Sequence, residues 1–150
     1  MAERRIDALI TSKYPDFSNL LRLLKEGQSK LGYLPENLLS DISESLGIAL
    51  GDVYGVATFY SFLSVQTQGR HTIRICKSLP CFIKESQQIV KAVEDVTGNK
   101  LGIPSTDARF SIRLTNCIGE CDRAPAMIID GRVYVELTPH KISQILKDYE

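Results

Sequence analysis

The chain has 150 residues, of which 43% are hydrophobic and 24% are charged, and its 18 Lys and Arg balance its 18 Asp and Glu. This length allows one ordinary domain or two small ones, and the balanced charge argues against a nucleic-acid or membrane-surface protein, which would carry a basic excess. No apolar run approaches the roughly 20 residues that cross a bilayer, and the charged N-terminus lacks the apolar stretch of a signal peptide, so we expect a cytoplasmic protein without direct membrane insertion.

Residues 1–68 follow a helical pattern. Asp16 can cap a helix that ends at Gly32, and Pro35 suits the first turn of another helix that ends at Gly47. Apolar residues recur along both helices at helical spacing. They are Phe17, Leu20, Leu21, Leu24 and Leu31 in the first helix, and Leu38, Leu39, Ile42 and Leu46 in the second.

Two further helices complete a predicted small bundle in this half of the chain. One is short and covers residues 4–9, and the other covers residues 52–61. We interpret Gly55, within the latter, as a close-packing position. The aromatic residues at this end of the bundle are interpreted as core, with some facing a partner. They are Tyr54, Phe59, Tyr60 and Phe62.

From residue 69 onward, strand patterns alternate with helix patterns. Apolar and polar residues alternate at 71–76 and at 110–115, which predicts two strands. Between them, an apolar stripe at 86–96 predicts a helix that ends at Gly98.

The last part of the chain predicts a hairpin and a final helix. Asp130 and Gly131 stand between two short apolar runs, which is a strong hairpin signal, and Thr138 followed by Pro139 starts the helix. The order strand, helix, strand, hairpin, helix indicates a four-stranded sheet of thioredoxin-like arrangement. The predicted fold class is therefore α+β, with a helical bundle (1–68) followed by a thioredoxin-like α/β domain (69–150).

The four cysteines form two close pairs, each directly after a predicted strand. Cys76 and Cys81 form C-x4-C, and Cys117 and Cys121 form C-x3-C. If the two strands are neighbours in one sheet, both pairs lie on loops that can curl around a common centre. Together they would supply the four thiolates of a 2Fe–2S cluster. The residues that would let backbone N–H groups point at the sulfurs are Ser78, Pro80 and Gly119.

Spacing alone does not decide the chemistry of the cysteines. Structural zinc also takes four thiolates at such spacings. Two disulfides are unusual in a chain without a secretory signal, and a dithiol redox enzyme normally shows C-x-x-C. Four ordinary buried cysteines would not be expected as close pairs at the ends of strands.

The sequence contains no other cofactor motif. Neither G-x-G-x-x-G nor G-x-x-x-x-G-K-[ST] occurs, so a dinucleotide or flavin must be bound by another chain. An iron–sulfur cluster moves one electron at a time and makes or breaks no bonds in a substrate. We therefore predict no catalytic residue and no cofactor-binding residue other than the four cysteines.

Four motifs occur in a characteristic order: GYLP (32–35), VYGVATFYSF (53–62), CKSLPC (76–81) and CIGECDRAPAM (117–127). Together they resemble the 24-kDa-type (E-subunit) family of NADH dehydrogenases. Its members are thioredoxin-like 2Fe–2S ferredoxins, also found in NAD(P)-linked and electron-bifurcating hydrogenases and in NAD-linked formate dehydrogenases. The resemblance extends from about residue 16 to the C-terminus. The chain departs from the usual family pattern at 77–80 and at 82–85.

The resemblance implies a 2Fe–2S cluster on Cys76, Cys81, Cys117 and Cys121. It also implies a flavoprotein partner that binds FMN and NAD(P)H, with further iron–sulfur or hydrogenase subunits in the same complex. We therefore interpret the chain as a non-catalytic electron-transfer subunit of an NAD(P)H-linked oxidoreductase. Residues 1–68 would be its docking unit, since a carrier ferredoxin needs little beyond the fold around its cluster. The alternatives are a free-standing ferredoxin and a zinc-stabilised interaction module.

Overall fold

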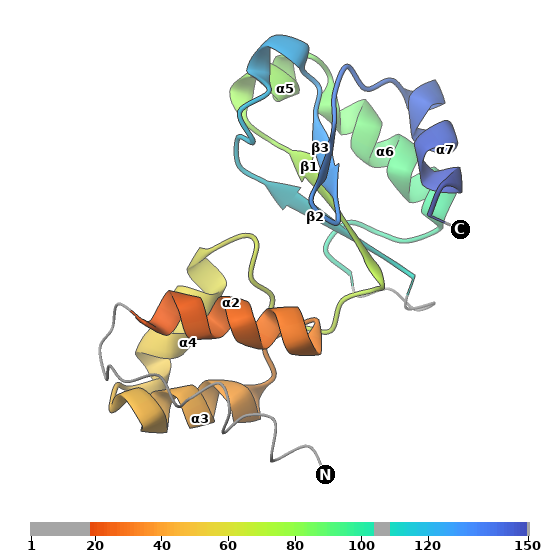
Figure 1. The fold of residues 1–150 in the computed structure, drawn as a ribbon. Coiled ribbons are helices and arrows are strands. Elements are labelled where there is room, and N and C mark those ends of the chain that lie inside the picture. Colours follow the sequence, from red (N-terminus) through yellow and green to blue (C-terminus); the bar gives the residue numbers. More distant parts are fainter. Residues whose placement is uncertain (1–18, 104–108, 150) are drawn as a thin grey trace. The chain divides into compact units, whose positions relative to one another are not determined.

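The computed structural model describes residues 19–103 and 109–149 (Figure 1). They form two compact units, divided between Thr67 and Gln68. The described residues contain six α-helices and one four-stranded sheet, which is the predicted α+β class. None of these helices is long and apolar enough to cross a membrane. The helix expected at residues 4–9 and the cap expected at Asp16 lie outside the described residues.

Three helices make up the described part of the N-terminal unit: α2 (Leu20–Leu31), α3 (Glu36–Leu46) and α4 (Leu50–Phe59). Helices α2 and α3 end where the sequence predicts, because Gly32 and Gly47 adopt the left-handed conformation that glycine tolerates. Pro35 directly precedes α3 rather than standing in its first turn. Helix α4 was expected at 52–61 but begins two residues earlier, because the Ala49 carbonyl accepts the N–H groups of Asp52 and Val53. It also ends two residues earlier, because Tyr60 is extended.

The core of this unit is aliphatic. Helix α2 approaches α3 closely at Gly27, where a Cβ atom would lie 2.6 Å from Cδ2 of Leu38. Leu31, predicted on the apolar stripe of its helix, is exposed instead. The buried side chains are Leu20, Leu23, Leu24, Leu34, Leu38, Leu39, Ile42, Val53 and Ala57.

The aromatic residues of α4 and of the segment after it are not part of this core, so their interpretation as core was wrong. Phe59 is 77% exposed, and the other three are exposed as well. Gly55 is not a close-packing position either, since no atom lies within 4 Å of where its Cβ would stand. The exposed aromatic residues are Tyr54, Phe59, Tyr60 and Phe62. Helical periodicity identifies an apolar face, but it does not say whether the chain itself covers that face.

The C-terminal unit is built on a mixed sheet with the strand order β2-β1-β3-β4. Strand β1 lies between β2, to which it is parallel, and β3, to which it is antiparallel. The first two strands and the Asp130–Gly131 hairpin occur where the sequence predicts them. The strands are β1 (His71–Cys76), β2 (Phe110–Thr115), β3 (Met127–Ile129) and β4 (Arg132–Tyr134).

Helices α6 (Ser86–Thr97) and α7 (Pro139–Lys147) run side by side next to the sheet (Figure 1). Thr138 caps α7 as predicted, because its side chain accepts a hydrogen bond from the N–H of Lys141. One buried core joins both helices to the sheet. It consists of Ile73, Ile75, Ile89, Val93, Phe110, Ile112, Met127, Ile129, Leu137, Ile142 and Leu146.

Candidate metal centre

Parallel pairing of β1 and β2 brings the two cysteine pairs to the same end of the sheet. Cys76, the last residue of β1, is in register with Thr115, the last residue of β2. The N–H of Lys77 donates to the Thr115 carbonyl at 3.0 Å, which holds the two strand ends together. Cys117 follows β2 by two residues. The pairing of β1 with β2 confirms the prediction that these two strands are neighbours in one sheet.

The sequence suggested that Cys81 lies on a free loop, but the structure differs. Cys81 lies on a five-residue helix, α5 (Leu79–Ile83), which follows β1 directly. Ser78 precedes this helix, and its carbonyl accepts the N–H of Phe82 at 2.9 Å, while Pro80 occupies the first turn. Cys81 is buried in this helix.

The second pair lies on an open loop that ends in a single turn of 3-10 helix, Cys121–Arg123. Gly119 has φ +93° within this loop, which favours glycine. Its N–H donates to the Sγ atom of Cys117 at 3.4 Å, as the sequence led us to expect. The sulfurs of Cys117 and Cys121 lie 3.2 Å apart.

The two pairs differ in their surroundings. Cys76 and Cys81 are 1% and 2% exposed, whereas Cys117 and Cys121 are exposed. Burial, with a hydrogen bond to Cys76, raises the pKa of Cys81 to about 11. The Gly119 N–H, with a hydrogen bond to Cys121, lowers the pKa of Cys117. The pKa of Cys121 is raised by the same bond with Cys117, by partial desolvation, and by the charges of Cys117 and Cys76.

Ala126 is a part of the centre that was not identified from the sequence. Its carbonyl accepts the N–H of Cys76 at 3.1 Å, and its backbone also hydrogen-bonds Cys81, which partly offsets the raised pKa of that thiol. Ala126 is fully buried and packs with both cysteines. No pattern in the sequence signals this contact, because it depends on the pairing of β3 with β1, which brings Ala126 beside Cys76.

A charged pair lies beside the exposed thiols. Nε of Arg123 is 3.1 Å from Oε2 of Glu120, and this carboxylate raises the pKa of Arg123. The two side chains therefore largely cancel each other's charge at the centre. Lys77 and Asp122, both exposed, are the remaining charged neighbours of the cysteines in sequence.

The donor set fits a two-iron cluster. All four cysteines are described, and the parallel pairing of β1 and β2 brings both pairs to the same end of the sheet. The pairs lie near enough to influence one another, since the charge of Cys76 contributes to the raised pKa of Cys121. A [2Fe–2S] cluster takes two thiolates on each of its two irons, so these two cysteine pairs would suit one.

The model of a family described as thioredoxin-like [2Fe-2S] ferredoxin matches residues 6–150. The chain belongs to this family. The resemblance seen in the sequence motifs is thereby confirmed, and a [2Fe–2S] cluster is the cofactor of the chain.

Curated relatives cover most of the chain. The E subunit of the NADH-quinone oxidoreductase of Escherichia coli is 40% identical over 130 residues, which are 87% of this chain and 78% of the relative. The E subunit from Pseudomonas aeruginosa is 37% identical over 129 residues, 86% of this chain and 78% of the relative. The HndA subunit of an NADP-reducing hydrogenase from Solidesulfovibrio fructosivorans is 31% identical over 146 residues, 97% of this chain and 85% of the relative.

A solved structure supports the fold. The NAD+-reducing [NiFe]-hydrogenase in its H2-reduced state matches with a TM-score of 0.74 and 23% identity over 87% of this chain. The match spans 22% of the length of that hydrogenase chain. At this identity, the likeness shows a shared fold.

Proposed function

We propose that this protein is an electron-transfer subunit of a multi-subunit NAD(P)H-linked oxidoreductase. It exchanges single electrons with a flavoprotein subunit that binds FMN and NAD(P)H. The holoenzyme is a complex I-type NADH dehydrogenase, a soluble NAD(P)-linked hydrogenase, with or without electron bifurcation, or a formate dehydrogenase. The ligands of its cluster are Cys76, Cys81, Cys117 and Cys121.

The observation that carries this proposal is the pair of dithiols at the shared end of two parallel strands. When bound, the cluster supplies a site for one electron. The chain's own residues prepare that site. Cys76 and Cys81 pack with Ala126, and the partly buried Ile118 and Val135 cover them, which excludes water on this side. The Gly119 N–H stabilises negative charge on Cys117.

The proposed flavoprotein follows from electron counting. NAD(P)H delivers two electrons together as hydride, and a flavin is the cofactor that divides the pair into single electrons. The sequence has no dinucleotide or phosphate motif, so both cofactors belong on another chain. The relatives support this proposal, since they are named as subunits of NADH- and NADP-linked enzymes.

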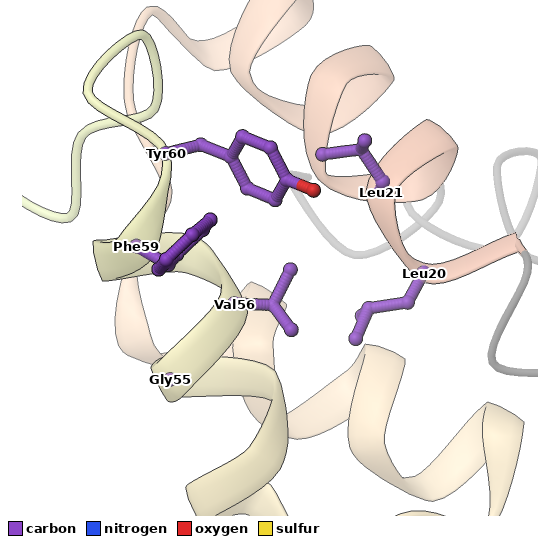
Figure 2. Close-up of a pocket in the computed structure, with 6 residues that line it drawn as sticks. All are labelled: Leu20, Leu21, Gly55, Val56, Phe59 and Tyr60. Atoms are coloured by element: carbon purple, nitrogen blue, oxygen red, sulfur yellow. The ribbon is translucent and has the colours of Figure 1, made fainter.

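We assign the docking of the flavoprotein to the N-terminal unit (1–68). Helices α2 and α4 face each other across an apolar hollow that Tyr60 closes at one end (Figure 2). The hollow is lined by Leu20 and Leu21 of α2 and by Gly55, Val56 and Phe59 of α4. We call this the α2–α4 hollow. The rings of Phe59 and Tyr60 stand edge to face, 5.1 Å apart between centroids. Exposed rings beside an apolar hollow are typical of a protein-binding surface.

Composition of the purified protein tests the central proposal. We expect iron and acid-labile sulfide in equal amounts, two of each per chain, with the visible absorbance of a [2Fe–2S] cluster. NADH should reduce this cluster only after the flavoprotein is added. A colourless protein with one zinc and no sulfide would establish the interaction module instead. Reduction by NADH without any flavin would refute the subunit role.

Docking is tested separately by co-purification with the flavoprotein. Deleting residues 1–68 should abolish binding, and Phe59→Gln should weaken it in the full chain. Leu31→Gln is the matched control, because Leu31 is also an exposed apolar residue of this unit but does not line the α2–α4 hollow. Binding that survives both the deletion and Phe59→Gln would contradict the docking role while leaving the cluster proposal intact.

A further inference from the structure

The two thiol pairs of the metal centre differ in a way that matters before the cluster is inserted. Cys117 and Cys121 are exposed, with their sulfurs 3.2 Å apart. Cys76 and Cys81 are almost fully buried and packed against Ala126. Reagents in solution therefore reach one pair and not the other.

We propose that, in the chain without its cluster, Cys117 and Cys121 form a reversible intramolecular disulfide when they react with a low-molecular-weight disulfide. Cys76 and Cys81 remain thiols under the same conditions. The inference rests on the proposed function, in which all four cysteines are ligands. It adds a modification site for small disulfides that reversibly blocks loading of the cluster.

The geometry of the exposed pair suits this reaction. A disulfide has an S–S length of about 2.05 Å, so the two sulfurs need to approach by only about 1.2 Å. Gly119, in the loop between them, is not packed in, because no atom other than those of its chain neighbours lies within 4 Å of the position that its Cβ would take. Cys121 is the first residue of a three-residue turn of 3-10 helix and is exposed.

The buried pair is protected by its surroundings. Cys81 lies on α5 and is hydrogen-bonded to Cys76, and Cys76 is fixed within the sheet by its N–H bond to the Ala126 carbonyl. A small disulfide cannot reach either sulfur without opening this part of the core. Thiol oxidation follows access of the reagent, so the exposed pair reacts first.

The chemistry balances without a further reagent. The sulfur of Cys117 attacks one sulfur of the small disulfide, forms a mixed disulfide and releases one thiolate. The sulfur of Cys121 then attacks the Cys117 sulfur and releases the second thiolate. Two electrons pass from the cysteines to the small disulfide, and the protons of the two cysteine thiols go to the released thiolates.

The test uses the full chain, freed of its cluster with a chelator and reductant under anaerobic conditions and then desalted. After incubation with oxidised glutathione, we expect the chain mass to fall by two hydrogen atoms. A peptide map should link Cys117 to Cys121, and the two remaining thiols should be alkylated only after unfolding. Dithiothreitol should restore four thiols. A map that links Cys76 to Cys81, links across the pairs, or shows two glutathione adducts would overturn the proposal.

Two cysteine variants and a comparison with the cluster-loaded chain test which sulfurs react. Cys121→Ser should stop the reaction at a glutathione adduct on Cys117, and Cys81→Ser should leave the Cys117–Cys121 disulfide unchanged. Absence of either result would contradict the proposal. In the cluster-loaded chain, none of the four cysteines should react with oxidised glutathione. If the loaded chain is protected but the freed chain forms no disulfide, only this inference fails; oxidation of the loaded chain at Cys117 would instead refute the ligand assignment.

Discussion

Gly69 lies where the chain approaches the backbone of the segment entering β2. A Cβ at this position would stand 2.8 Å from N and C of Phe110 and 2.9 Å from C of Arg109. These atoms belong to the backbone and cannot rotate away as a side chain would. The Gly69 N–H also donates to Oγ of Ser111 at 2.7 Å, so displacing the residue loses a hydrogen bond. Gly69→Ala should therefore force β1 and β2 apart at their first residues.

The expected cost is about 1–3 kcal/mol, the range for overpacking a well-packed site. With a urea dependence of roughly 1–3 kcal/mol/M for a domain of this size, the unfolding midpoint of the C-terminal unit should fall by about 1 M. Gly55→Ala is the matched control. It also adds one methyl group, but its Cβ meets no atom within 4 Å and it lies within α4. This change should stabilise the N-terminal unit by up to about 1 kcal/mol, because alanine favours helix over glycine.

Hydrogen exchange with mass spectrometry across a urea series would measure the unfolding midpoint of each of the two units separately. Peptides from β1 and β2 report the C-terminal unit, and peptides from α2 and α4 report the N-terminal unit. Gly69→Ala should lower the midpoint for the first group only. An unchanged midpoint in the strand peptides would show that residue 69 does not lie against the entry to β2, and the described approach would be wrong.

The other predictions concern the cluster and the pH dependence of stability. Cys117→Ser should lower the iron and sulfide bound per chain, because an oxygen ligand replaces thiolate poorly; unchanged content would refute the four-ligand assignment. A fragment of residues 69–150 should fold and hold the cluster, since the described core of this unit uses no residue before Ile73; a folded fragment without a cluster would show that the boundary is misplaced. Glu94 accepts the N–H of Leu101 at 2.8 Å, and this bond lowers the pKa of the Glu94 carboxyl group. The bond therefore stabilises the fold at neutral pH, and this stabilisation is lost as the pH falls through the lowered pKa. Glu94→Gln should destabilise the protein at about pH 7, with a difference from the native chain that shrinks below about pH 4; a difference independent of pH in urea unfolding would contradict this assignment.

Local rules explain how far the sequence predicted the fold. Strands β1 and β2 were found with their bounds because their apolar residues alternate, and α2, α3 and α6 were ended by glycines that adopt positive φ values. Helix α5 was missed because five residues are too few to show a helical period. Exposure of the aromatic residues of α4 was missed because periodicity does not distinguish a face that the chain covers from one that it leaves open.

The candidate site was predicted in a similar way. The spacing of the cysteines showed two pairs after two strands, and the motifs around them matched a known family. The spacing could not show that Cys76 and Cys81 are buried while Cys117 and Cys121 are exposed. That difference depends on β3, which places Ala126 against the first pair only, and on α5, which encloses Cys81.

The sheet order also has a consequence for synthesis of the protein. Strand β1 pairs in parallel with a strand that begins only at Phe110 and in antiparallel fashion with one that begins at Met127. A ribosome therefore releases Cys76 and Cys81 well before the chain that must bring Cys117 beside them. The helices of the N-terminal unit contact one another over short stretches of chain, so this unit can fold during translation, whereas the non-local sheet must wait. Because the four proposed ligands meet only in the finished sheet, iron and sulfide should be inserted after translation rather than into the emerging chain.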